Sequence, residues 1–192
     1  MERPSDPAFA DLPIRCARMT LRPLTADDLD ALVELDSDPE VMRWINGGVP
    51  QSRERYLDDL LPRMLAWPDR AWGFFAAISD EAGEAGAFLG WFHMKPSVAD
   101  AEVLELGYRL RRAAWGRGLA TEGGRRLVRW AFERFDPPMV DACCDPMNLA
   151  SARVMEKCGM SELPRFIHPR ANIEVRRLGV TREDFRRAGF PA

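Results

Sequence analysis

The segment from residue 105 to residue 122 constrains the fold more than any other part of the chain. It passes from an apolar strand through a glycine turn into the start of a helix. Gly116 and Gly118 can adopt backbone angles closed to other residues, and they let a ligand approach the main chain. The first N–H groups of the following helix have no intrahelical acceptor and lie at the positive end of the helix dipole. This order of elements predicts a phosphate-binding site.

Two kinds of nucleotide site do not fit this turn. A dinucleotide fingerprint needs glycines at its first, third and sixth positions, but the sixth position counted from Gly116 is Thr121. A P-loop needs Gly-Lys followed by Ser or Thr, and the chain has no such sequence. The turn is therefore predicted to hold a different phosphate ligand.

Residues 115–120 resemble the Gln/Arg-x-x-Gly-x-Gly/Ala signature with which GNAT N-acetyltransferases hold the pyrophosphate of acetyl-CoA, with Trp115 in place of Gln or Arg. The longer segment that continues through Thr121 and Glu122 resembles the RimJ/RimL-like branch, whose best-known members acetylate the amino termini of ribosomal proteins. Residues 145–160 are similar to the Asp-Pro-x-Asn-x-x-Ser helix of that branch, with Met160 in place of the usual Phe. Residues 19–24 and the helix after them also match. Residues 1–13 lie outside the resemblance and are expected to form an extended N-terminal tail.

The resemblance implies a single domain over residues 1–192, of the α/β (α+β) class. We expect three layers, with a mixed, mostly antiparallel sheet of about six or seven strands between helices. It also implies an enzyme that transfers an acetyl group from its co-substrate acetyl-CoA to a primary amine, by direct attack in a ternary complex and with no metal. The acceptor could be a protein or peptide N-terminus or a small-molecule amine. A catalytically silent CoA-binding or partner-binding module is the alternative, and a homodimer and a different acyl group remain open.

Three residues are candidates for catalysis by this resemblance. Glu105 lies on the other side of its strand from the leucines, so its carboxylate could face the acceptor amine as a general base, with Glu102 as a rival. Ser151 is the candidate proton donor to the departing CoA thiolate, and Tyr108 is the alternative donor. Plainer explanations exist for each: an exposed strand glutamate, a residue that starts a helix capped by Asn148, and a core aromatic.

The residues expected to contact acetyl-CoA come from the turn and from the second motif: Arg109, Leu110, Trp115, Gly116, Arg117, Gly118, Leu119, Ala120, Thr121, Asn148 and Arg153. Arg117 is the strongest candidate among the basic side chains, because its position in the pattern is commonly basic. Arg111, Arg112, Arg125 and Lys157 also flank the motifs, although a solvated basic face would explain them. His93 and His168 have no partner at metal-ligand spacing and are expected to be structural; His168 could instead line the acceptor pocket.

Hydrophobic periodicity and turn residues indicate the remaining elements. Strands are expected over about residues 14–24, 72–79, 87–95, 102–110 and 140–144, with a last hairpin over 165–180. Helices are expected after Thr25, from Pro39, from Ser52, over 119–135 and from Asn148. Gly123 and Gly124 each cost roughly 1 kcal/mol relative to alanine inside a helix, which predicts close packing there on the sheet or the cofactor.

Composition agrees with a globular domain and excludes some functions. The 192 residues are 46% hydrophobic, and the net charge of −3 argues against a dedicated nucleic-acid binder. The polar start of the chain does not resemble a secretory signal, and no apolar run approaches the ~20 residues of a membrane span, so we expect a cytoplasmic protein. The four cysteines lack Cys-x-x-Cys spacing, so neither a zinc site nor a disulfide framework is expected.

Overall fold

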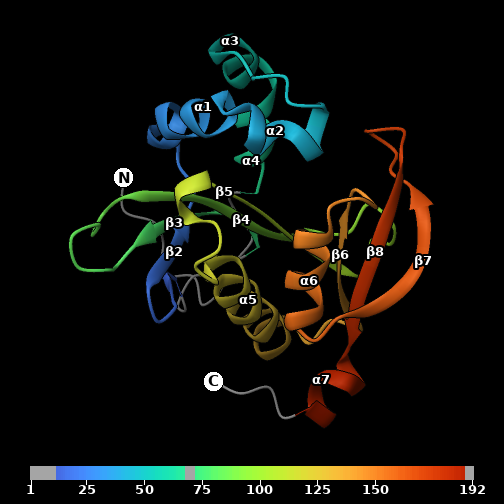
Figure 1. Cartoon of the computed structure of the whole chain (residues 1–192). Coiled ribbons are helices and arrows are strands. Elements are labelled where there is room, and N and C mark those ends of the chain that lie inside the picture. The colour runs from blue at the N-terminus through green and yellow to red at the C-terminus, as the bar shows by residue number, and fades with distance from the viewer. Residues whose placement is uncertain (1–11, 68–71, 189–192) are drawn as a thin grey trace.

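The computed structural model describes residues 12–67 and 72–188. It contains one sheet with helices on both faces (Figure 1). Of the tail expected at residues 1–13, residues 1–11 lie outside the described part of the chain. Every helix among the described residues is too short or too polar to span a bilayer.

The sheet has eight described strands: β1 (Ile14–Arg15), β2 (Met19–Pro23), β3 (Gly73–Ser79), β4 (Phe88–Pro96), β5 (Leu104–Leu110), β6 (Met139–Cys144), β7 (Ser161–Ile167) and β8 (Glu174–Thr181). Their order is β1-β2-β3-β4-β5-β6-β8-β7, and among them the neighbours β5 and β6 alone run parallel. The mixed, mostly antiparallel sheet that we expected is confirmed. It has one more strand than expected because the first predicted strand bends back after Cys16, whose N–H donates to the Met19 carbonyl at 2.9 Å.

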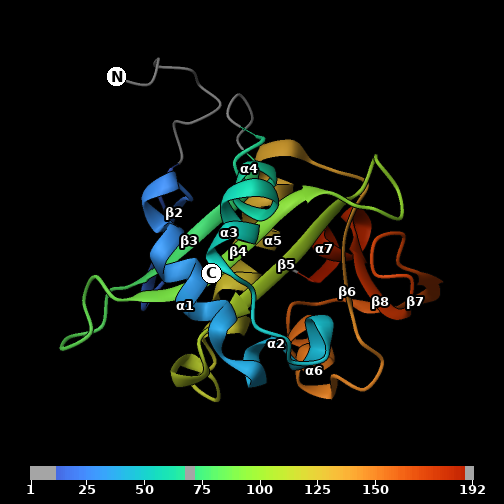
Figure 2. The same cartoon turned by 90° about the horizontal axis from the view of Figure 1, so that it is seen from above.

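One layer of helices lies above the sheet in Figure 1: α1 (Leu29–Ser37), α2 (Pro39–Asn46), α3 (Arg53–Arg55) and α4 (Leu61–Met64). A 3₁₀ turn, Ala26–Asp28, precedes α1, and the π-helical segment η3 (Tyr56–Leu60) joins α3 to α4. Figure 2 shows this layer over the β2–β5 half of the sheet. The predicted helix starts are confirmed: Asp38 accepts from the Glu40 N–H, and Ser52 accepts from the Arg55 N–H.

The opposite face carries α5 (Leu119–Phe135) and α6 (Leu149–Lys157), and α7 (Arg182–Ala188) follows β8. The expected close packing at the α5 glycines is confirmed. A Cβ at Gly123 would lie 2.4 Å from Phe92 Cζ on β4, and a Cβ at Gly124 would lie 2.8 Å from the sulfur of Cys158 after α6. The two glycines therefore bring α5 against the sheet and against α6, which fixes where the start of α5 lies.

Candidate active site

β5 and β6 pair only where they begin. Leu104 pairs with Val140, and Glu105 pairs with Asp141. In contrast, every residue of β5 pairs with β4, and every residue of β6 pairs with β8. Beyond Glu105, the edge of β5 that faces β6 has no strand partner among the described residues. Backbone N–H and C=O groups need partners when they are buried, so this edge can bind an extended ligand.

The glycine turn follows the end of β5 and a short 3₁₀ helix, η4 (Arg112–Ala114). Gly116 has φ +71° and Gly118 has φ +82°, both in the left-handed region that favours glycine. The Trp115 indole N–H donates to the Leu110 carbonyl at 2.8 Å and ties the turn to the end of β5. The backbone N–H groups of residues 119–121 have no acceptor within the described chain, as the first turn of a helix leaves them.

This turn fits a pyrophosphate group. A Cβ at Gly116 would meet no atom within 4 Å, and one at Gly118 would meet only Arg18 Nη2 at 3.6 Å, so the main chain is open to a ligand. The nearest carboxylate in the first turn of α5, Glu122, accepts from the Arg18 N–H and from Arg18 Nε, both at 2.8 Å. Its charge is therefore balanced, and the helix start keeps its attraction for an anion.

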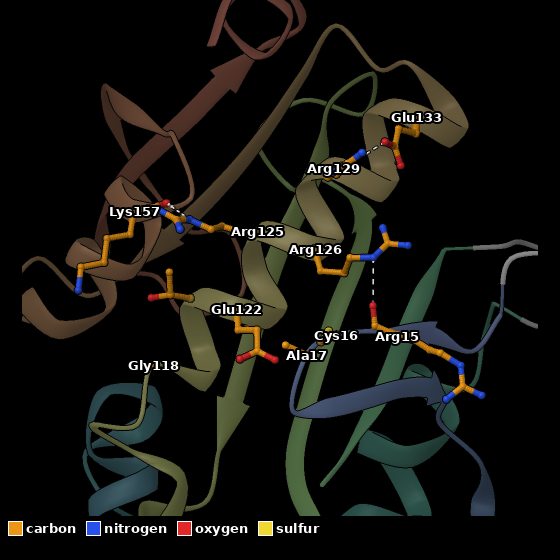
Figure 3. A pocket seen from close by; sticks show the side chains of 11 residues that line it. Arg15, Cys16, Ala17, Gly118, Glu122, Arg125, Arg126, Arg129, Glu133 and Lys157 are labelled. Carbon is orange, nitrogen blue, oxygen red and sulfur yellow. Dashed lines mark hydrogen bonds and ion pairs between the residues drawn. The ribbon is translucent and has the colours of Figure 1, made fainter. Parts of the chain in front are cut away.

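A surface groove of about 810 Å³ begins at Gly118 and extends along α5 to Glu133 (Figure 3). Glu133 is paired with Arg129 at 2.7 Å, and Glu122 is paired with Arg18. The basic side chains that line the groove outnumber these acids: Arg15, Arg125, Arg126, Arg129 and Lys157. The groove is thus a positively charged extension of the glycine turn. Figure 3 shows Arg125 and Lys157 together on one side of it.

Two arginines expected to contact acetyl-CoA are bonded elsewhere through their side chains. Arg117 Nη2 contacts Glu81 and lies 3.0 Å from Glu84, both in the loop after β3. The Arg109 guanidinium lies on the opposite face of the sheet, where Nη1 donates to Asp36 Oδ2 at 2.5 Å. Neither guanidinium is free for a phosphate, so a contact with acetyl-CoA stays a prediction for their main chains alone.

The other residues expected to contact acetyl-CoA also differ in whether the main chain or the side chain can meet a ligand. Leu110 and Leu119 are buried, so their main chains alone can meet a ligand. Asn148 caps α6 by accepting from the Ser151 N–H at 3.1 Å, as predicted. Arg153 is exposed on α6, and Thr121 lines the groove.

Tyr108 and Ser151 lie together. The two hydroxyl groups are 2.9 Å apart, and they join β5 to the first turn of α6. Burial raises the pKa of Tyr108 well above its usual value, so the phenol stays protonated at neutral pH. The sequence treated these residues as alternative proton donors, whereas the geometry couples them.

Glu105 lies in a buried cluster on the face of the sheet that carries α1–α4. Its Oε1 atom is 2.6 Å from Lys95 Nζ and 3.0 Å from His93 Nε2, both on β4. Burial alone would raise the pKa of Glu105, but the His93 hydrogen bond and the Lys95 charge outweigh it and lower this pKa to about 2. The carboxylate is therefore ionised at neutral pH. It is not the exposed glutamate of the plainer explanation.

The same rung of the sheet carries a second buried carboxylate, because Asp141 pairs with Glu105. Asp141 accepts from Ser97 Oγ at 2.9 Å and from Arg177 Nε at 2.7 Å, and all of these donors reach Oδ2. His168, between β7 and β8, accepts hydrogen bonds from two backbone N–H groups at Nδ1, and burial lowers its pKa, with smaller effects from the charges of Glu105 and Lys95. The expectation that His168 could line the acceptor side remains a prediction.

Sequence reasoning missed the residues that surround Glu105. His93 and Lys95 pair in register with Gly107 and Glu105, so strand alternation would have brought them to the same face once the β4–β5 register was known. Gly107 leaves room for the His93 ring, because a Cβ there would lie 2.3 Å from His93 Cε1. Apart from the place of Asp141 in an apolar strand, nothing in the sequence indicates that this carboxylate belongs to the site.

The comparison with known families agrees with this geometry. Residues 18–161 match the model of the acetyltransferase (GNAT) domain, and this range contains both the glycine turn and the whole of the second motif. The chain belongs to the GNAT acetyltransferase family. It is therefore an acyltransferase with acetyl-CoA as co-substrate, and the alternative of a catalytically silent module is not retained.

Several relatives of this GNAT acetyltransferase are known. The FsC-acetyl coenzyme A-N(2)-transacetylase of Aspergillus fumigatus is 29% identical over 193 residues, which cover 93% of the chain and 80% of the relative. A GNAT acetyltransferase structure from Bacillus anthracis has a TM-score of 0.72 at 24% identity, covering 88% of this chain and 98% of that one. The aminoglycoside acetyltransferase AAC(6′)-Ib, solved with coenzyme A and kanamycin, has a TM-score of 0.73 at 21% identity, covering 89% and 99%. These structures share the fold.

Proposed function

We propose that this chain acetylates a small-molecule primary amine by direct attack in a ternary complex, as a single domain over residues 1–192. The observation that carries the proposal is the parting of β5 and β6 beyond Glu105, between the open glycine turn and a buried carboxylate. An opening of this kind lets two reactants meet from opposite faces of one sheet. Holding both reactants in line supplies much of the acceleration of such a reaction.

The donor side of the site is the face that carries α5 and α6. The main-chain N–H groups of residues 119–121 bind the pyrophosphate, and Arg125 and Lys157 in the adjoining groove attract the remaining phosphate charge. The free edge of β5 aligns the extended part of the ligand. Acetyl-CoA supplies the thioester whose acetyl carbon is attacked.

On the acceptor side, Glu105 attracts the amine as its ammonium ion. Its Oε1 atom already holds His93 and Lys95, and Oε2 has no hydrogen-bond partner among the described residues. The carboxylate takes up the proton of the amine directly or through water, as the resemblance implies. The low pKa of Glu105 favours the ionised form that binds the cation.

Ser151 delivers a proton to the leaving sulfur, and Tyr108 donates a proton to Ser151 in turn. Ser151 is held at the start of α6 by the Asn148 cap, and its hydroxyl contacts the Tyr108 phenol at 2.9 Å. A proton that leaves Ser151 can be replaced from Tyr108, because the phenol is protonated at neutral pH. The pair therefore acts as one donor.

The acceptor class rests on two competing resemblances. The RimJ/RimL-like form of both motifs favours a protein N-terminus. The name of the Aspergillus fumigatus relative describes acetyl transfer to an N(2) position, and the match extends over 93% of the chain. AAC(6′)-Ib, with the same fold, is an aminoglycoside acetyltransferase. We give more weight to the relative that matches nearly the whole chain, so we place a small-molecule amine first.

A thiol-release assay tests this choice. The protein is offered acetyl-CoA with a panel of small amines and of peptides with free N-termini, each paired with its own N-acetylated form as the control. We expect some small amines to release CoA thiol and their acetylated forms to release none. Release with peptides alone would contradict the small-molecule proposal in favour of the RimJ/RimL-like one. Failure of every amine, with acetyl-CoA bound, would contradict both.

A further inference from the structure

Lys95 is an unusual residue for this chain. Of 27 lysines and arginines, only Lys95 and Lys157 are lysines. An arginine guanidinium stays protonated in proteins, whereas a lysine amine can lose its proton and act as a nucleophile. Lys157 ends α6 and lines the groove on the donor face. Lys95 is thus the one side-chain primary amine of the chain that lies beside Glu105.

The position of the Lys95 amine matches that of an acceptor. Nζ lies 2.6 Å from Glu105 Oε1, the carboxylate proposed to attract the acceptor ammonium. Lys95 and Glu105 are register partners, and the same rung continues to Asp141, where the pairing of β5 with β6 ends. The Lys95 side chain is 14% exposed, so this amine is largely enclosed but still reachable. The Lys95 amine therefore lies on the last rung at which β5 and β6 pair, where the opening between these two strands begins.

We propose that Lys95 is a site of self-acetylation, with acetyl-CoA as the donor. This inference rests on the proposed function, because it uses the same donor site and the same carboxylate. The Lys95 ammonium first gives one proton to water, and the electron pair left on Nζ forms a C–N bond to the acetyl carbon. The C–S bond of the thioester breaks as that bond forms. The sulfur takes a proton from Ser151, and the new amide nitrogen sheds a proton that replaces it.

The products of this step balance. One lysine ammonium and one acetyl-CoA become one Nζ-acetyl-lysine, one CoA thiol and one proton released to solvent. No oxidant, metal or further co-reactant is required. The change also removes the positive charge that Lys95 places beside Glu105, so the modified protein differs from the unmodified one inside the acceptor site and not only at its surface.

Isotope labelling tests the proposal, and the chain provides its own control. The full-length protein is incubated with deuterated acetyl-CoA without an acceptor, and peptides that contain Lys95 and Lys157 are quantified by mass spectrometry over time. Lys157 is the more exposed of the two and reports uncatalysed acetylation. We expect labelling of Lys95 to be at least about tenfold faster, because its amine is positioned by the site. Equal rates, or no label at Lys95, would overturn the proposal.

Two variants separate catalysis from simple reactivity. Glu105→Gln should lower labelling of Lys95 to the rate at Lys157, and a thermal shift with acetyl-CoA establishes that the variant is folded. Ser151→Ala leaves the Lys95–Glu105 pair intact and should slow labelling by the same factor as it slows amine turnover. Labelling that neither variant changes would be chemical and would overturn the proposal.

The same samples distinguish this inference from the proposed function. Turnover of external amines without label at Lys95 would overturn self-acetylation and leave the proposed function standing. If acetyl-CoA binds but neither external amines nor Lys95 are acetylated, the proposed function itself fails. Label at Lys95 that forms faster than at Lys157, and that Glu105→Gln and Ser151→Ala both slow, would support self-acetylation at this residue.

Discussion

Glu105 owes its charge to two neighbours on the adjacent strand. Burial of a carboxylate disfavours the ionised form, and His93 and Lys95 reverse that effect. His93 is buried and its pKa is lowered by burial, so the neutral ring donates a hydrogen bond and Lys95 supplies the charge. This arrangement keeps an anion on the acceptor face of the sheet. It also links the stability of the fold to pH.

The first prediction concerns this linkage. The pKa of Glu105 falls from 4.5 to about 2 on folding, so its contribution to stability is present above pH 4.5 and is lost as pH falls toward 2. A shift of this size is worth about 3 kcal/mol. Glu105→Gln should therefore lower the free energy of unfolding at pH 6, and the difference from wild type should shrink toward zero near pH 2, as measured by urea denaturation.

Glu102 provides the control for this measurement. It is exposed just before β5, and Glu102→Gln should leave the pH dependence of unfolding close to that of the wild type. A Glu105→Gln deficit that stays constant from pH 6 to pH 2 would contradict the ionised, paired carboxylate.

The second prediction concerns the pair formed by Tyr108 and Ser151. If the two hydroxyls act as one donor, Tyr108→Phe and Ser151→Ala should each lower kcat by roughly 10- to 100-fold. The double variant should lose little more than the worse single one, because either change interrupts the same proton path. The KM for acetyl-CoA should change little. Losses that multiply in the double variant would show two independent roles.

At the scale of elements, α5 organises the donor side. Its first turn presents free N–H groups at residues 119–121, and its two internal glycines set its distance from the sheet.

The third prediction concerns Gly123, where helix propensity and packing have opposite effects on stability. Helix propensity alone favours Gly123→Ala by about 1 kcal/mol, but a Cβ there would lie 2.4 Å from Phe92 Cζ. Overpacking costs about 1–3 kcal/mol, so the variant should unfold at lower urea concentration than the wild type. A stabilised Gly123→Ala would contradict the close approach.

The elements that the sequence could predict are those with a local signal. The limits of α5 followed from its apolar stripe and Gly118, and the start of α6 followed from the Asn148 cap. The helix α7 was missed because it buries no residue, although Thr181 and Asp184 form capping contacts that a capping-box search could find.

Contacts between distant elements could not be predicted. Arg109 was assigned to the cofactor because it lies next to the motif, but Asp36, its partner, is 73 positions away on α1. Arg117 was assigned by its place in the pattern, and its partners Glu81 and Glu84 come from the loop after β3. Only the assembled sheet brings these charges together. The main-chain part of the site was predictable because it depends on glycines and a helix start alone.

At the scale of the whole molecule, one sheet separates two chemical environments. The α5–α6 face presents free N–H groups and a basic groove, which suit the phosphates of acetyl-CoA. The α1–α4 face presents buried carboxylates, which suit a cationic acceptor. The parting of β5 from β6 connects the two faces at Glu105. The central claim is therefore that the start of α5 holds the donor by its phosphates.

The affinity for acetyl-CoA of a matched pair of variants, measured by calorimetry, tests this claim most directly. Thr121→Asp and Thr121→Asn have the same shape at the first turn of α5, and they differ in charge. An acid there favours the helix, so the Asp variant should be at least as stable as the Asn variant. A negative charge beside a bound phosphate costs about 1–3 kcal/mol, so the Asp variant should bind acetyl-CoA roughly 10- to 100-fold more weakly. Equal dissociation constants for the two variants would contradict a phosphate site at the start of α5.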